Sequence, residues 1–116
     1  MTFPLGCDAM SVREITVAEL ETLLPSGVLI VDVRETHEYV EGHVPGAVHV
    51  VLNTVPDHVD AFRGDGTTYV ICAAGGRSHR ACEFLADQGL DVVNVAGGTM
   101  QWIAGGRPIV TGSSPL

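Results

Sequence analysis

Cys72 is the residue of this sequence best suited to chemistry, because a thiolate is a strong nucleophile. It ends the β-branched run 68–72 and is followed by Ala73, Ala74, Gly75, Gly76, Arg77 and Ser78. Backbone N–H groups of a glycine-containing loop can point inward at an anion, a helix beginning near Arg77 supplies partial positive charge, and the guanidinium adds a full one. Such surroundings lower a cysteine pKa to about 3.5–7.5. We expect Cys72 to be a thiolate near neutral pH, with its sulfur open to substrates.

The alternative for a cysteine at a strand end is an inert core residue, because free cysteines are often buried. The run Gly-Gly-Arg-Ser at 75–78 favours the reactive interpretation, since a core cysteine needs none of these residues. The other cysteines lack such neighbours, because Cys7 lies near the start of the sequence and Cys82 on the apolar face of an expected helix. Three cysteines without disulfide or zinc spacing indicate free thiols in a reducing compartment, and we expect Cys7 and Cys82 to be inert.

The elements that must position Cys72 alternate between strands and helices. A capping box at Thr16 and Glu19 begins the first helix and Pro25 ends it. Further helices are expected over 36–41, 55–63 and 77–88, and a short one after Gly97-Gly98 holds Trp102. Strands are expected over 28–33, 47–51, 68–72 and 92–95, and their apolar composition is typical of strands buried on both faces.

This alternation predicts one α/β domain with a parallel sheet covered on both sides. Ligands in such folds bind beyond the carboxyl ends of the strands, where loops enter helices, and Cys72 stands at such a point. We expect the tail after Pro108 to be loosely held.

Composition excludes several functions. The 116 residues carry a formal net charge of −8 with only six lysines and arginines, so nucleic acid is a poor partner. No run reaches the roughly 20 apolar residues that span a bilayer, and the start lacks signal-peptide features. We expect a cytoplasmic protein, monomeric through charge repulsion. The histidines show no metal-ligand spacing, so no metal is expected.

Three motifs in order resemble the single-domain rhodanese family. The stretch 72–78 matches the active-site loop C-x-x-G-x-R-S of that family. Asp32-Val-Arg34, Glu38-Tyr39 and the run 42–47 resemble its first characteristic region, and Gly97-Gly98 with Trp102 resembles its C-terminal region. The resemblance covers residues 12–110, which leaves 1–11 as an N-terminal extension and 111–116 as a C-terminal tail.

The resemblance implies a rhodanese-like fold, a five-stranded parallel sheet with helices on both faces, and a thiosulfate sulfurtransferase. Cys72 would attack the outer sulfur of thiosulfate or a persulfide, become a persulfide itself, and pass the sulfur to cyanide, a thiol or a protein acceptor. No cofactor is needed beyond the persulfide. Arg77 would hold the anionic donor, and the N–H groups of residues 73–78 would cradle the sulfur. Ser78 either caps the helix or hydrogen-bonds the sulfur, and we expect capping.

Five further residues carry structural roles in this interpretation. By resemblance, Asp32 supports the active-site side of the sheet and Arg34 pairs with Glu38, with substrate contact by Arg34 as the minority alternative. His43, in a tight turn between Gly42 and Pro45, is expected to be a hydrogen-bonded structural histidine, since sulfur transfer from a thiolate needs no base. Trp102 is expected to anchor the core.

Three other interpretations compete with free thiosulfate turnover. Cysteine phosphatases and arsenate reductases of related fold use a loop one residue longer between cysteine and arginine, so the shorter loop here fits a sulfur atom better than a phosphoryl group. A module that only binds a partner typically lacks the loop cysteine, which is present. A sulfur carrier that serves one protein partner, without significant thiosulfate turnover, stays open, because such loops serve thiosulfate, persulfides and protein partners alike.

Overall fold

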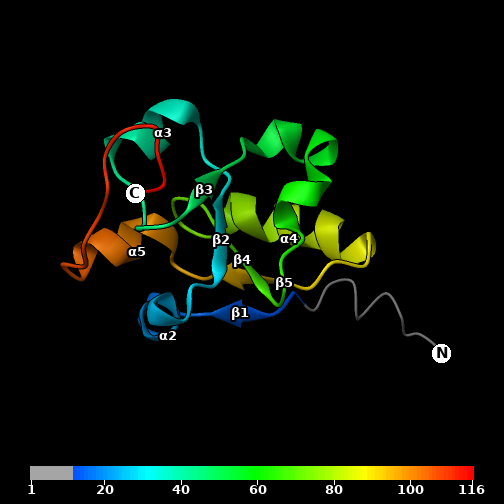
Figure 1. Cartoon of the computed structure of the whole chain (residues 1–116), viewed down its shortest axis with the longest axis horizontal. Helices are drawn as coiled ribbons and strands as arrows, with labels where there is room; N and C mark the ends of the chain where they lie inside the picture. The colour runs from blue at the N-terminus through cyan, green and yellow to red at the C-terminus, as the bar shows by residue number, and fades with distance from the viewer. Residues whose placement is uncertain (1–11) are drawn as a thin grey trace.

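Five short parallel strands form the sheet at the centre of the molecule. The computed structural model describes residues 12–116, so the N-terminal extension 1–11 and Cys7 lie outside the described residues. The strands are β1 (Glu14–Ile15), β2 (Leu29–Asp32), β3 (Val48–His49), β4 (Thr68–Ile71) and β5 (Val92–Val95), and their order across the sheet is β1-β5-β4-β2-β3. All four strand pairings are parallel (Figure 1). This confirms the five-stranded sheet implied by the family resemblance.

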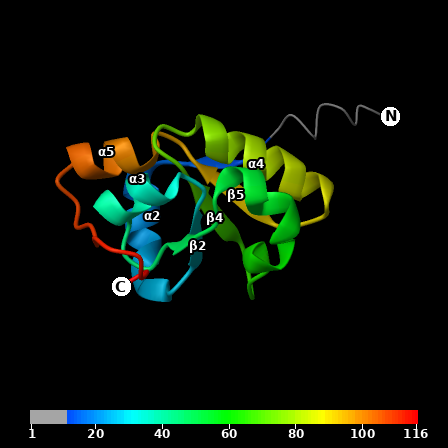
Figure 2. The same cartoon turned by 90° about the horizontal axis from the view of Figure 1, so that it is seen from above.

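The helices cover both faces of the sheet. Those with α-helical geometry are α2 (Val17–Leu23), α3 (Thr36–Glu41), α4 (Gly76–Asp87) and α5 (Gly98–Ala104), and 3-10 turns are η1 (Leu24–Ser26), η2 (Leu52–Asp57) and η3 (Val59–Phe62). Side chains of α2, α3 and α5 share one core with Ile30 and Ile71. Side chains of α4, η2 and η3 share the other with Val31 and Val70. In the view from above, α4 lies on one side of the sheet and α2, α3 and α5 lie on the other (Figure 2). Successive strand residues therefore point to opposite cores.

Most elements follow the sequence pattern closely. Thr16 caps α2 and forms the capping box with Glu19. Trp102 is completely buried and donates to the carbonyl oxygen of Pro108 at 2.7 Å, which confirms it as a core anchor. No helix within residues 12–116 is long and apolar enough to cross a membrane.

Two expectations about the strands and helices were incomplete. The pattern showed four strands and did not show β1, which has only two residues and pairs with β5 alone. The single helix expected over 55–63 is instead the two 3-10 segments η2 and η3, which meet at His58. The two segments do not join because His58 leaves helical geometry, with φ −132° and ψ 34°.

The tail after Pro108 is not loosely held, contrary to expectation. Val110 and His43 exchange two backbone hydrogen bonds of 2.9 Å each. Further along, Gly112 donates to Val40 in α3, and Gly46 donates to the carbonyl of Pro115. The end of the chain thus lies beside α3 (Figure 1). There its backbone groups, in place of water, form hydrogen bonds with the segment 40–46.

Candidate active site

Cys72 directly follows β4, with β5 on one side of that strand and β2 on the other. Strand alternation turns its side chain toward the core that α4 covers. The residue is only 1% exposed, so the sulfur is covered rather than open as the sequence suggested. The loop that follows the strand explains this difference.

The segment from Ala73 to Gly75 folds back over the sulfur. Gly75 has φ +106°, a left-handed conformation that glycine adopts without strain, and it forms the N-cap of α4. Its backbone N–H donates to Cys72 Sγ at 3.1 Å. Ala74 and Gly76 form the exposed outer surface of the loop. The sulfur is therefore buried against polar groups of its own loop as well as against the core.

Hydrogen bonds hold the pKa of the Cys72 thiol below its ordinary value. Burial by itself raises that pKa. The hydroxyl and backbone of Ser78 and the amides of Gly75 and Ala74 act in the opposite direction and together outweigh burial. The expected thiolate-favouring cradle thus has a geometric basis in the loop and the first turn of α4.

Ser78 does not cap α4, contrary to expectation. The N-cap of the helix is Gly75, and no side chain forms a capping hydrogen bond. The Ser78 hydroxyl lies 3.3 Å from Cys72 Sγ and also contacts Asn94 Oδ1. A hydroxyl has a single proton, so Ser78 donates to only one of these two acceptors at a time. Ser78 therefore connects the sulfur to a buried polar network.

Asn94 is the centre of that network, and the sequence did not single it out. Its Nδ2 donates to the Gly75 carbonyl at 3.1 Å and to Glu14 Oε2 at 2.8 Å. Both amide protons are thereby used, so Oδ1 is the acceptor that competes with Cys72 Sγ for the Ser78 proton. The available signal was a polar residue inside the apolar run 92–95. Asn94 thus links β1, β5 and the loop around Cys72.

The start of α5 holds the loop from its other side. Thr99 N–H donates to the carbonyl of Cys72 at 2.8 Å, and Met100 N–H donates to Ala73 at 2.9 Å. Gly98 permits this close approach, because a Cβ there would lie 2.5 Å from the carbonyl oxygens of Cys72 and Ala73. The glycine pair 97–98 therefore allows close contact with the loop, in addition to the turn expected from the sequence.

Arg77 forms a bidentate ion pair with Glu38 of α3. Nη1 lies 2.8 Å from Oε1, and Nη2 lies 2.9 Å from Oε2. The hydrogen bond from Arg77 lowers the pKa of Glu38 to about 2, against a smaller opposing effect of burial. The sequence had paired Glu38 with Arg34, and that pairing was wrong.

Arg34 instead binds Asp32, and both side chains are almost completely buried. Its Nε contacts both carboxylate oxygens at 3.0 Å, and its Nη2 donates to Asp32 Oδ2 and to the carbonyl of Gly42, each at 2.8 Å. Asp32 also accepts from the backbone N–H of Arg34. Asp32 is the last residue of β2, so this pair fixes the turn that follows that strand.

His43 is fully buried and stacks on Tyr39, with ring centroids 3.6 Å apart. Its Nδ1 lies 2.7 Å from the Tyr39 carbonyl and its Nε2 lies 2.8 Å from the Ser114 carbonyl. These contacts are those of a hydrogen-bonded structural histidine, as the sequence suggested.

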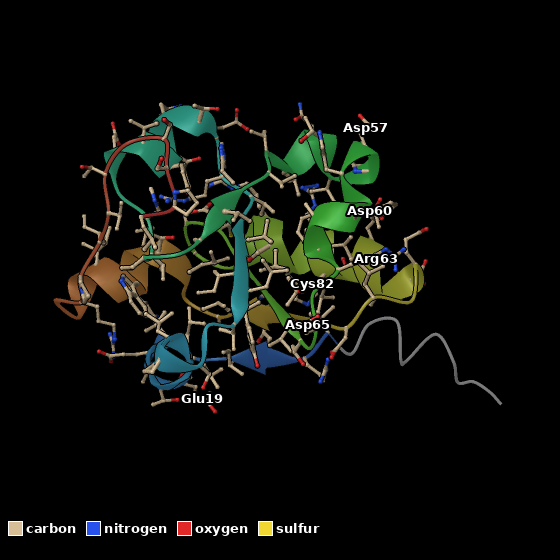
Figure 3. All side chains as sticks on the ribbon, viewed as in Figure 1. Glu19, Asp57, Asp60, Arg63, Asp65 and Cys82 are labelled. Carbon is tan, nitrogen blue, oxygen red and sulfur yellow. The ribbon has the colours of Figure 1, made fainter. Side chains whose placement is uncertain are left out.

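Cys82 faces the core from α4 (Figure 3). Burial raises the pKa of its thiol to about 12, with a smaller contribution from nearby Glu14. The inert thiol expected there is consistent with this environment. Within residues 12–116, no three His, Cys, Asp or Glu side chains lie close enough together to hold a metal ion.

The model of the rhodanese-like domain family matches residues 16–105. The chain belongs to the rhodanese-like domain family. The putative sulfurtransferase YtwF of Bacillus subtilis is 35% identical over 101 residues, covering 85% of this chain and 98% of the relative. The thiosulfate sulfurtransferase GlpE of Pseudomonas putida strain GB-1 is 35% identical over 86 residues, covering 73% and 78%.

A solved structure agrees with this rhodanese-like assignment. The rhodanese-related protein of Thermoplasma volcanium superposes with a TM-score of 0.79 at 34% identity, over 84% of this chain and 97% of that protein. Membership in the rhodanese-like family and the names of these relatives support a sulfurtransferase-type activity.

Proposed function

We propose that this rhodanese-like domain transfers sulfane sulfur from thiosulfate or a persulfide donor to a thiophilic acceptor, through a persulfide on Cys72. The observation that carries the proposal is the cradle around Cys72 Sγ, in which the Gly75 amide and the Ser78 hydroxyl lie within 3.3 Å. These donors favour a negative charge on sulfur, which both the attacking thiolate and the persulfide product carry.

The first half-reaction forms one sulfur–sulfur bond and breaks another. The Cys72 thiolate attacks the outer sulfur of thiosulfate, and the bond between the two thiosulfate sulfurs breaks with its electron pair leaving on sulfite. Cys72 then carries a persulfide anion. Charge is conserved, because the thiolate and dianionic thiosulfate become a monoanionic persulfide and dianionic sulfite.

The second half-reaction returns the enzyme to its starting state. Cyanide or an acceptor thiolate attacks the outer sulfur of the persulfide, and the electron pair of that sulfur–sulfur bond returns to Cys72. Thiocyanate or a new persulfide leaves. Such covalent, two-step transfer has ping-pong kinetics, and it requires no proton-transferring base because the nucleophile is already ionised.

Burial of Cys72 sets a condition on both half-reactions. With the residue 1% exposed, a donor reaches the sulfur only when the loop over it moves outward. The exposed residues Ala74 and Gly76 form that outer cover, and neither has a bulky side chain to displace. We therefore place the entry of donor and acceptor at this part of the loop.

The test is persulfide formation on the intact chain. After incubation with thiosulfate, mass spectrometry of peptides should find one added sulfur atom on Cys72, which cyanide removes as thiocyanate. The Cys72→Ser variant should form no adduct and no thiocyanate, whereas Cys82→Ser should retain both. Full turnover in the Cys72→Ser variant would disprove the proposal. An aryl phosphate assay provides the second arm, since phosphate release that depends on Cys72 would instead indicate a phosphatase.

A further inference from the structure

The guanidinium expected to bind an anionic donor is already occupied. Both terminal nitrogens of Arg77 bind the two carboxylate oxygens of Glu38, at 2.8 and 2.9 Å. The two side chains are 33% and 24% exposed, so the pair lies at the surface beside the loop. Bidentate Arg–carboxylate pairs are the stronger and geometrically fixed kind. Arg77 therefore offers a donor little free positive charge.

Arg34 and Arg80 do not supply the free positive charge that Arg77 lacks. Arg34 is buried and bound to Asp32. Arg80 is exposed and one turn further along α4 than Arg77. The pKa of Arg77 is raised chiefly by its hydrogen bond to Glu38, with smaller effects of the Cys72 and Glu35 charges. Arg77 thus lies within electrostatic range of the sulfur, together with two carboxylates.

We propose that Glu38 determines the donor charge preference of this site, by occupying Arg77 so that donors with at most one negative charge are favoured over the thiosulfate dianion. Organic persulfides and thiosulfonates belong to the favoured class. The inference rests on the proposed function, because it concerns the donor of the same sulfur transfer. A dianion must displace Glu38 from Arg77 or approach against its carboxylate, and the repulsion it meets is twice that of a monoanion.

Thiosulfate and methanethiosulfonate form a matched pair of donors for the test. Cys72 attacks the outer sulfur of either one, and the sulfur–sulfur bond breaks with its electron pair on sulfite or on methanesulfinate. The two reactions leave the same persulfide on Cys72. The donors differ by one unit of charge, so the ratio of their kcat/KM values reports how the site responds to charge.

The decisive variant is Glu38→Gln. Its amide oxygen can still accept the hydrogen bond that Glu38 Oε1 receives from the backbone N–H of Glu35, so the cap of α3 is retained. Arg77 is left with an uncompensated charge. We expect the ratio of kcat/KM for thiosulfate over methanethiosulfonate to rise about tenfold, since one unit charge a few ångströms away in a partly exposed site has roughly that effect. The change should appear mainly in KM for thiosulfate.

Two controls separate this effect from net charge. Glu41→Gln makes the same charge change at the exposed end of α3 and should leave the donor ratio within about twofold, because exposed distant charges are screened. The double variant Glu38→Gln/Arg77→Gln removes both charges of the pair and should restore a ratio near that of the parent chain. Thermal unfolding of each variant checks that it is folded.

The outcomes distinguish this inference from the proposed function. If the parent chain forms a persulfide from both donors but Glu38→Gln leaves the ratio unchanged, the role of Glu38 is disproved and the sulfur transfer stands. An equal shift in Glu41→Gln also disproves it. If the parent chain takes sulfur from neither donor, the proposed function fails and the inference fails with it.

Discussion

Cys72 and Cys82 lie in the same hydrophobic core, yet the pKa of the Cys72 thiol is lowered and that of the Cys82 thiol is raised. Burial disfavours the thiolate at both positions. At Cys82 only a smaller effect of the Arg13 charge opposes burial, so the pKa rises to about 12. At Cys72 burial is also the largest single effect, but the hydroxyl and backbone of Ser78 and the amides of Gly75 and Ala74 together exceed it. Reactivity therefore depends on where the loop amides point and not on how deeply the sulfur lies.

This difference predicts the pH dependence of alkylation. The pKa of Cys72 is lowered from 9.0, so its thiolate fraction, and with it the iodoacetamide rate, should reach half of its maximum below pH 9. Cys82 should stay unmodified up to about pH 10, since its thiol ionises only near 12. Peptide mass spectrometry separates the sites.

A variant of Ser78 tests whether its hydroxyl lowers the pKa of Cys72. Ser78→Ala removes the hydroxyl 3.3 Å from the sulfur and should move the Cys72 midpoint to higher pH by up to about one unit, the typical scale of one hydrogen bond to a charged group. A midpoint of Cys72 at or above 9 in the parent chain would contradict the cradle described above.

Residue types could be predicted from the sequence, but their partners could not. The nucleophile and its loop followed from Cys72, the glycines and Arg77, because such local spacing determines the turn. The pairing of Arg77 with Glu38 joins residues 39 positions apart, and Asn94 meets Glu14 across 80 positions. Such contacts depend on the order of the strands and on the direction of each helix, which single motifs do not contain. The error over Arg34 and Glu38 has this origin.

At the scale of elements, the site depends on the point where the start of α5 crosses the loop after Cys72. The first turn of α5 donates to the carbonyls of Cys72 and Ala73, so the loop amides remain free to face the sulfur. The sequence pattern predicted the strand before the loop and the helix after it to within one or two residues. It gave no indication that α5, which begins 26 residues after Cys72, holds the same loop.

Gly98→Ala should disrupt this crossing. The new Cβ would lie 2.5 Å from two backbone carbonyl oxygens, at a residue with φ +58°, so α5 and the loop must separate. We expect a loss of about 2–4 kcal/mol in the free energy of unfolding, since overpacking and a strained φ each cost about 1–3 kcal/mol. Urea unfolding measures this loss.

Gly76→Ala is the control for that substitution. A Cβ at Gly76 meets nothing within 4 Å and the residue has no positive φ, so its unfolding free energy should stay within about 0.5 kcal/mol. The alkylation midpoint of Cys72 should rise in Gly98→Ala and stay constant in Gly76→Ala. Equal stability of the two variants would show that the crossing is not tightly packed.

At the scale of the molecule, the sheet separates two hydrophobic cores, one that holds Cys72 and one that lies beside the C-terminal tail. The α4 side holds Cys72, Ser78 and Asn94, whereas the other side holds Trp102 and Tyr39 with the segment that binds the tail. Acidic side chains such as Asp57, Asp60 and Asp65 lie on the outer surface (Figure 3). A change in the tail should therefore alter stability without altering the thiol.

Removal of residues 112–116 tests that separation. The buried Nε2 of His43 loses the Ser114 carbonyl, and Gly46 loses the Pro115 carbonyl, while the bridge between His43 and Val110 remains. A buried polar atom left without its partner costs about 1–3 kcal/mol, so the free energy of unfolding should fall by that amount. Urea unfolding followed by fluorescence of Trp102, the only tryptophan, measures it.

The control for this truncation is removal of Leu116 alone. That side chain is 85% exposed and the carbonyls of Ser114 and Pro115 are kept, so stability should match the parent chain. The alkylation midpoint of Cys72 should be the same in all three proteins, because the tail contacts His43, Gly46 and Val40 and not the loop. A shifted midpoint in the longer truncation would show that the two cores are coupled through the sheet, since β2 leads toward the tail-binding segment and pairs along its length with β4.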